Sequence, residues 1–114
     1  MASGLPRIRG TQVGLKNPGN IDKIKEDMLT GRFTYQELQA RIGGVRDHQG
    51  TYYIVDGHHR MVAAFELYQE TGDLKFIQEL LFWGKWDEVE YPHPQRRPLP
   101  SRYWWQAFRN WWGF

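Results

Sequence analysis

The stretch "TYYIVDGHHRMVAA", residues 51–64, holds the strongest structural signal in the chain. Its first five residues are all β-branched or aromatic, which is typical of a strand, and their mostly apolar character favours a central place in a sheet. Asp56 and Gly57 form a turn pair, and apolar residues then recur over residues 61–68 at the spacing of one helix face. The stretch therefore predicts a strand that ends at a glycine and runs directly into a helix.

Residues 42–50 predict a partner for this strand. The β-rich arms "IGGVR" and "TYYIV" flank the turn sequence "DHQG", which is typical of a β-hairpin. Further upstream, "PRIRGTQVGL", residues 6–15, is expected to form a short first strand that runs into a turn.

The spacing of apolar residues predicts three further helices. The first covers residues 21–30 and is expected to be capped by Asn20. The second is short and begins at the capping box "TYQE", residues 34–37. The third is expected to be capped by Asp73 and ended by Gly84.

These elements indicate a small α+β domain with one mixed sheet backed by helices. We expect residues 1–92 to form this core, with "WDEVEY", residues 86–91, as a last strand or extended arm. Residues 93–114 are expected to form a proline-rich linker followed by an amphipathic, aromatic-rich helical segment that Ser101 caps and that packs on the core.

Composition excludes several classes of protein. A chain of 114 residues is most simply one domain and can bury a sizeable core. It has no cysteine, which excludes disulfides, thiol catalysis and cysteine-bound zinc. No apolar run approaches the ~20 residues of a membrane span, and the start "MASGLPRIRG" lacks the apolar core of a signal peptide. We therefore expect no transmembrane segment and no signal peptide.

The net charge of +2 is unevenly distributed. Residues 91–114 carry no acidic residue and four arginines, which are Arg96, Arg97, Arg102 and Arg109. Such a basic end favours an anionic partner, which is nucleic acid, a phosphate-bearing surface or an acidic protein. An end that only improves solubility is the alternative.

Three large polar side chains follow Gly57 at the start of the predicted helix, namely His58, His59 and Arg60. The first amides of a helix have no partner within it, and the helix dipole adds partial positive charge, so this end attracts phosphate. Arginine binds two phosphate oxygens at once, and histidine donates a hydrogen bond or moves a proton near neutral pH. The turn therefore predicts a phosphate-binding site with its own acid and base groups. A solvated turn without a ligand is the alternative.

Asp56 supports this turn in one of two ways, because it either caps the helix or orients a histidine. A divalent metal held by Asp56, His58 and His59 is a further interpretation. Adjacent histidines on a helix point about 100° apart, and their spacing is not that of the His-Glu-x-x-His motif. We therefore do not expect the pair to bind one ion together, and the metal content of the site stays open.

Two acidic residues are candidate ligands for a Mg²⁺ ion that bridges the phosphates: Asp47 in the hairpin turn and Glu66 on the following helix. Carboxylate oxygens are ligands that Mg²⁺ prefers in proteins. Nothing in the spacing of these residues requires the ion.

The stretch "GTYYIVDGHHRMVAAFEL", residues 50–67, resembles the ParB/sulfiredoxin-like superfamily, particularly its ParB-like nuclease branch. In that family a strand leads through a Gly-x-x-Arg type of turn, here "GHHR", into a helix with small residues. The first strand of many relatives ends in a pair like Thr11-Gln12, so the resemblance covers about residues 6–72. It implies the fold of that superfamily.

The resemblance also implies phosphate chemistry. In the family this turn binds nucleotide phosphates, and some members cut nucleic acid or hydrolyse nucleotides. His58 stands where sulfiredoxins carry their reactive cysteine, which excludes sulfinic acid repair, and the chain is too short for the helical DNA-binding domain of the segregation protein. Small domains with this turn also look like the C-terminal toxic domains of bacterial polymorphic toxins.

The expected function is therefore that of a ParB-like nuclease, which hydrolyses phosphodiester bonds of DNA or RNA, as a toxin domain or as a small independent relative. A module that binds or hydrolyses nucleotides is one alternative, and a non-catalytic interaction domain is another. We expect the protein to act in the cytoplasm, either of its own cell or of a target cell.

The resemblance assigns roles to individual residues. The amides of the turn hold the phosphoryl group, and Arg60 neutralises charge on its oxygens. His58 or His59 acts as general base or acid, with His58 preferred because it occupies the reactive position of the superfamily. Thr11 and Gln12 are expected to reach the same pocket, where Gln12 hydrogen-bonds a ribose, a base or a phosphate.

The C-terminal segment is rich in aromatic residues, including Trp104, Trp105, Trp111 and Trp112. We expect them to pack on the core. The alternatives are a patch that binds an immunity-type protein, another copy of the chain or single-stranded nucleic acid, and attachment to a membrane surface.

Overall fold

The computed structural model describes residues 7–12, 15 and 17–100. In chain order these residues form β1 (Ile8–Arg9), α1 (Asn20–Leu29), β2 (Gly43–Asp47), β3 (Tyr52–Asp56), α2 (His58–Thr71), α3 (Lys75–Trp83) and β4 (Lys85–Val89). The predicted α+β class is confirmed. Within the described residues, every helix is too short or too polar to cross a bilayer.

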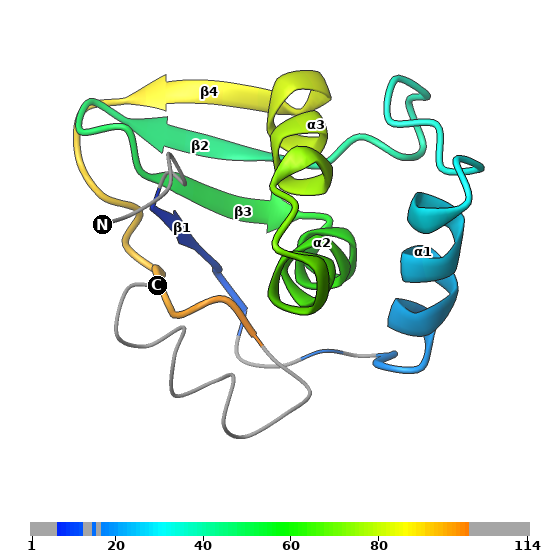
Figure 1. Ribbon diagram of the computed structural model, residues 1–114. Helices are drawn as coiled ribbons and strands as arrows, with labels where there is room; N and C mark the ends of the chain where they lie inside the picture. Colours follow the sequence, from blue (N-terminus) through cyan, green and yellow to red (C-terminus); the bar gives the residue numbers. More distant parts are fainter. Residues whose placement is uncertain (1–6, 13–14, 16, 101–114) are drawn as a thin grey trace.

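The strands form one mixed sheet in the order β1-β3-β2-β4 (Figure 1). β3 pairs in parallel with β1 and antiparallel with β2, and β2 pairs in parallel with β4. The predicted hairpin is thus confirmed, and so is the central place of its second arm, where Ile54 is fully buried.

A buried carboxylate holds the turn of this hairpin. Asp47 accepts hydrogen bonds from the backbone amides of Gln49 and Thr51 and from the hydroxyl of Tyr53. These three donors lower the pKa of Asp47 against the opposing effect of its burial. The residue therefore has a structural role at the end of β3 that lies away from Gly57.

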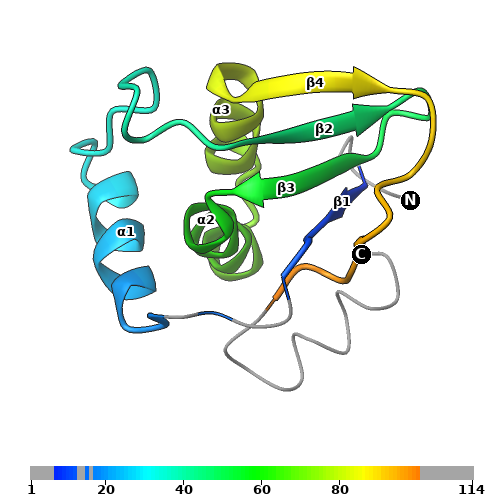
Figure 2. The same ribbon diagram turned by 180° about the vertical axis from the view of Figure 1, so that it is seen from behind.

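The helices pack against one face of the sheet. α2 and α3 lie side by side on that face, and α1 packs on the outer side of α2 (Figures 1 and 2). The core that they enclose is apolar and includes Ile21, Ile54, Met61, Leu67, Ile77 and Leu80. An ion pair also joins α1 to α2, because the amino group of Lys25 lies 3.0 Å from the buried carboxylate of Glu66.

Two of the predicted local signals are wrong. Asn20 does not cap α1; it is the first helical residue, and Gly19 precedes it without a side-chain cap. The capping box at residues 34–37 opens no helix, because the chain there makes a series of turns with hydrogen bonds such as that from Glu37 N to Thr34 O. Leu38 is 78% exposed, so this segment has little apolar surface to stabilise a helix by packing.

The segment after β4 returns to β1. Arg97 and Gly10 exchange two backbone hydrogen bonds of 2.8 Å, and Leu99 is buried in the core. Residues 97–100 therefore pack on the core rather than extend away from it, which Figure 1 shows in orange beside β1. The predicted aromatic helix and its cap Ser101 lie outside the described residues.

Candidate functional site at the start of helix α2

β3 enters α2 through one residue that only glycine can provide. Gly57 has φ +99°, in the left-handed region that favours glycine. A side chain there would also collide with Ile42, whose Cγ2 lies 2.3 Å from the position of a Cβ atom. The strand and the helix are therefore joined without a loop, and the turn holds His58, His59 and Arg60 at the end of the sheet.

No side chain among the described residues caps α2. Asp56 is the last residue of β3 and is exposed, so the prediction that it caps the helix is wrong. The first hydrogen bond of the helix runs from the amide of Met61 to the carbonyl oxygen of Gly57. The amides of His58, His59 and Arg60 precede it, so they have no acceptor within the helix.

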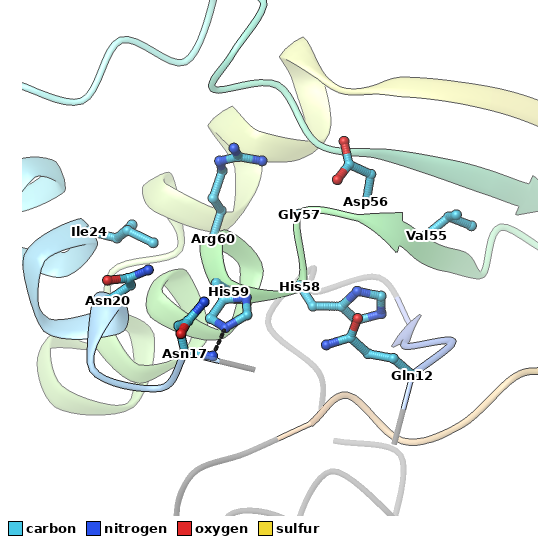
Figure 3. A pocket seen from close by; sticks show the side chains of 10 residues that line it. All are labelled: Gln12, Asn17, Asn20, Ile24, Val55, Asp56, Gly57, His58, His59 and Arg60. Carbon is cyan, nitrogen blue, oxygen red and sulfur yellow. Dashed lines mark hydrogen bonds between the residues drawn. The ribbon is translucent and has the colours of Figure 1, made fainter. Parts of the chain in front are cut away.

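A pocket of about 340 Å³ lies at this end of the helix (Figure 3). Its walls include Gln12, Asp56, Gly57, His58, His59 and Arg60, which the sequence predicted to lie together. Thr11 is not among the residues given for its walls; its hydroxyl donates to the carbonyl oxygen of Ile54, and its amide binds His58.

The sequence analysis missed four residues of this pocket: Asn17, Asn20, Ile24 and Val55. The polar turn "NPGN", residues 17–20, follows the first strand directly and was a signal for two of them. Ile24 and Val55 had no such signal, since an apolar residue on a predicted element is expected to face the core.

His58 is only 3% exposed, and its ring is already in use. Its Nε2 accepts a hydrogen bond of 3.1 Å from the amide of Thr11. Burial, reinforced by the neighbouring His59, lowers the pKa of His58 to about 4, although Asp56 acts in the opposite direction. The imidazole is therefore neutral at pH 7 and joins the end of β1 to α2, a position that does not favour the proton-carrying role predicted for it.

His59 makes a matching contact on the other side of the pocket. Its Nε2 accepts a hydrogen bond of 3.1 Å from the amide of Asn17, drawn as a dashed line in Figure 3. The ring is less buried than that of His58 and borders the pocket. The two histidines thus hold both ends of residues 11–17, which connect β1 to the turn before α1.

Arg60 reaches a third segment of the chain. One of its terminal nitrogens, Nη2, donates a hydrogen bond of 2.7 Å to the carbonyl oxygen of Gln39. Figure 3 shows the side chain pointing away from the two imidazole rings, on the same side as Asp56. The guanidinium has five donor hydrogens, so one carbonyl contact leaves most of its capacity for a ligand.

The two predicted Mg²⁺ ligands lie elsewhere. Asp47 holds the hairpin turn, and Glu66 is paired with Lys25. Among residues 7–12, 15 and 17–100, no group of three or more histidine, cysteine, aspartate or glutamate side chains is arranged to hold a metal ion. In this part of the chain the chemistry of the pocket therefore rests on amides, imidazoles and one guanidinium.

Comparison with known proteins finds no relative. No family model, no curated protein and no solved structure matches the chain. The fold and the pocket are therefore interpreted from their own geometry.

Proposed function

We propose that the pocket at the start of α2 binds the phosphate group of a nucleotide or of a nucleic acid chain, as the resemblance to ParB-like nucleases suggests. One observation carries this proposal: the amides of His58, His59 and Arg60 open without a side-chain cap onto the pocket. A phosphate there would accept hydrogen bonds from these amides and interact favourably with the helix dipole. Arg60 supplies the positive charge that a phosphate diester needs.

Hydrolysis of the bound phosphodiester is the second candidate function, and it corresponds to the activity of a ParB-like nuclease. It requires a group that moves a proton at the pocket. His59 fits this role better than His58, because His59 borders the pocket with a less buried ring. Its Nε2 becomes available as a base when the contact with the amide of Asn17 opens. A toxin activity would depend on this second function.

Binding is tested by replacing Arg60. The variant Arg60→Ala removes the only guanidinium among the residues that line the pocket in the described part of the chain. We expect its affinity for a nucleoside monophosphate, measured by calorimetry, to fall about tenfold, since a charged hydrogen bond contributes about 1.5 kcal/mol or more. Arg32→Ala is the control, because Arg32 is paired with Glu26 and Asp27 on α1. Equal affinity of the Arg60 variant and the native protein would contradict the proposal.

Hydrolysis is tested separately. The native protein is incubated with plasmid DNA, RNA and free nucleotides, with and without Mg²⁺, and the products are separated. We expect products from one of these substrates and their loss in His59→Ala, with binding of the nucleoside monophosphate retained. Absence of products from the native protein would rule out hydrolysis and leave binding as the function.

A further inference from the structure

Arginine side chains from distant parts of the chain gather beside β1. Arg9 on β1 and Arg96 and Arg97 after β4 line a second pocket of about 220 Å³ together with Pro98. The backbone hydrogen bonds between Gly10 and Arg97 hold the two segments against each other. We call these three arginines the arginine cluster.

The fold gives the cluster no negative partner. Within the described residues, neither its three guanidinium groups nor that of Arg7 forms an ion pair with a carboxylate. The contacts of the cluster are to backbone oxygens, from Arg9 to the carbonyl of Ile8 and from Arg96 to that of His93. The residues outside the described ranges contain no aspartate or glutamate, so they add no acidic side chain.

The positive charge in this pocket is partly shielded from water. Arg9 is half-buried, and both its burial and the nearby charge of Arg7 lower its pKa. The hydroxyl of Tyr53 acts in the opposite direction, but this hydroxyl already donates its hydrogen bond to Asp47. Like charges held together in this way are unfavourable for the folded protein, and an anion bound among them would offset the repulsion.

The cluster and the α2 pocket share a wall. Gly10 separates them, because a Cβ atom there would lie 3.3 Å from Nε2 of His58 on one side and 3.0 Å from Cδ of Pro100 on the other. Gln12, which lines the α2 pocket, follows Arg9 by three residues, which span at most about 10 Å of extended chain. A stacked strand of nucleic acid advances about 3.4 Å per nucleotide, so roughly three nucleotides cover this distance.

We propose that Arg9, Arg96 and Arg97 bind a second phosphate group, and that the ligand of this protein is a single strand of nucleic acid rather than a free nucleotide. The proposal rests on the function proposed for the α2 pocket, which holds the first phosphate. The arginine cluster then selects for polymers, because a mononucleotide has no second phosphodiester to place there. Its contribution is electrostatic and independent of base sequence.

The salt dependence of binding tests the arginine cluster. Affinity for a single-stranded oligonucleotide is measured at several salt concentrations for the native protein and for Arg96→Gln/Arg97→Gln. Both arginines are exposed, so the variant is expected to fold, which thermal unfolding checks. We expect its affinity to fall and the slope of log affinity against log salt to become shallower by about two, roughly one per lost phosphate contact. Binding of a nucleoside monophosphate is expected to change less than twofold.

The matched control is Arg32→Gln/Arg46→Gln, which removes the same charge from arginines paired with acidic residues elsewhere on the surface. A native affinity and slope in Arg96→Gln/Arg97→Gln, or an equal loss in the control, would overturn the proposal. Binding of the native protein to anionic lipid vesicles but not to the oligonucleotide would also overturn it. If the nucleoside monophosphate does not bind the native protein while the oligonucleotide slope still depends on Arg96 and Arg97, the function proposed for the α2 pocket fails and the arginine site stands.

Discussion

The α2 pocket and the arginine pocket flank the same strand, yet the fold treats their polar groups in opposite ways. In the α2 pocket each long polar side chain of the turn has a partner from the chain: His58 binds the amide of Thr11, and His59 and Arg60 have backbone partners as well. In the arginine pocket no carboxylate of the described residues pairs with Arg9, Arg96 or Arg97.

This difference separates two tasks. The side chains of the α2 pocket hold the surrounding segments in place, and the groups left for a ligand are mainly the backbone amides that the helix cannot satisfy itself. The arginine cluster holds nothing comparable and presents uncompensated charge. One pocket therefore provides geometry and the other provides attraction, and the following variants act on one of them at a time.

The largest effect is expected from Gly57→Ala, which disturbs the α2 pocket alone. The new Cβ would meet Ile42 at 2.3 Å, and alanine disfavours φ +99°. We expect the free energy of unfolding, measured in urea, to fall by about 3 kcal/mol from backbone strain and overpacking together. Gly50→Ala is the control, because Gly50 has φ +87° with open space around it, and about 1 kcal/mol is expected there. Equal losses would show that Ile42 does not constrain the turn.

The next effect is a pH dependence from His58. Its pKa is about 4 in the folded protein and ordinarily 6.5, so the unfolded chain takes up a proton between these values that the folded protein excludes. Stability from this residue is therefore complete above pH 6.5 and is lost as the pH falls to about 4. The loss amounts to about 2 kcal/mol once solvent screening is allowed for.

The variant His58→Gln isolates this term, since a glutamine oxygen can still accept from the amide of Thr11 but does not titrate in this range. Denaturant unfolding of both proteins between pH 4 and 7 is expected to give a shallower decline for the variant. Parallel pH profiles would mean that His58 is protonated in the folded state and does not act as the acceptor.

A smaller effect is expected from His59→Ala. Loss of one hydrogen bond at a partly exposed site should lower the free energy of unfolding by about 1 kcal/mol. The specific readout is hydrogen exchange, which is expected to become faster at the amide of Asn17. His48→Ala, in the exposed hairpin turn, serves as the control and should leave that amide unchanged. Native exchange of the Asn17 amide in His59→Ala would remove the second contact from the account.

The smallest effect concerns the stability of the arginine pocket. Arg96→Gln/Arg97→Gln relieves repulsion without removing an ion pair among the described residues, so the melting temperature at low salt is expected to rise slightly. The rise should disappear at high salt, where charges are screened. Arg32→Gln, which loses its ion pairs, is expected to shift in the opposite direction. A destabilised double variant would indicate that the cluster is structural.

The sequence was sufficient where structure is local. The hairpin and the start of α2 follow from strand composition and from Asp56-Gly57, and both are confirmed. The helix expected at residues 34–37 failed because a capping pattern is not enough without an apolar face to bury. The cap at Asn20 failed for a similar reason, since the helix there begins one residue earlier than the polar side chain suggested.

The site was predictable in membership but not in roles. The sequence brought Gly57 and the next three residues together correctly, because they are neighbours in the chain. It could not show that Thr11, 47 residues from His58, occupies the ring nitrogen on which the predicted acid-base role depended. The basic end around Arg96 and Arg97 was recognised from charge alone, whereas the contribution of Arg9 requires the pairing of Gly10 with Arg97.

The most direct test of the phosphate site is to observe its amides. The ¹⁵N-labelled protein is titrated with a nucleoside monophosphate at pH 7 and followed by NMR. We predict saturable shifts for the amides of His58, His59 and Arg60, with little change at the start of α3, which also lacks a side-chain cap at its N-cap residue. Unchanged α2 amides, or shifts no larger than those at the start of α3, would contradict the claim that α2 holds a phosphate.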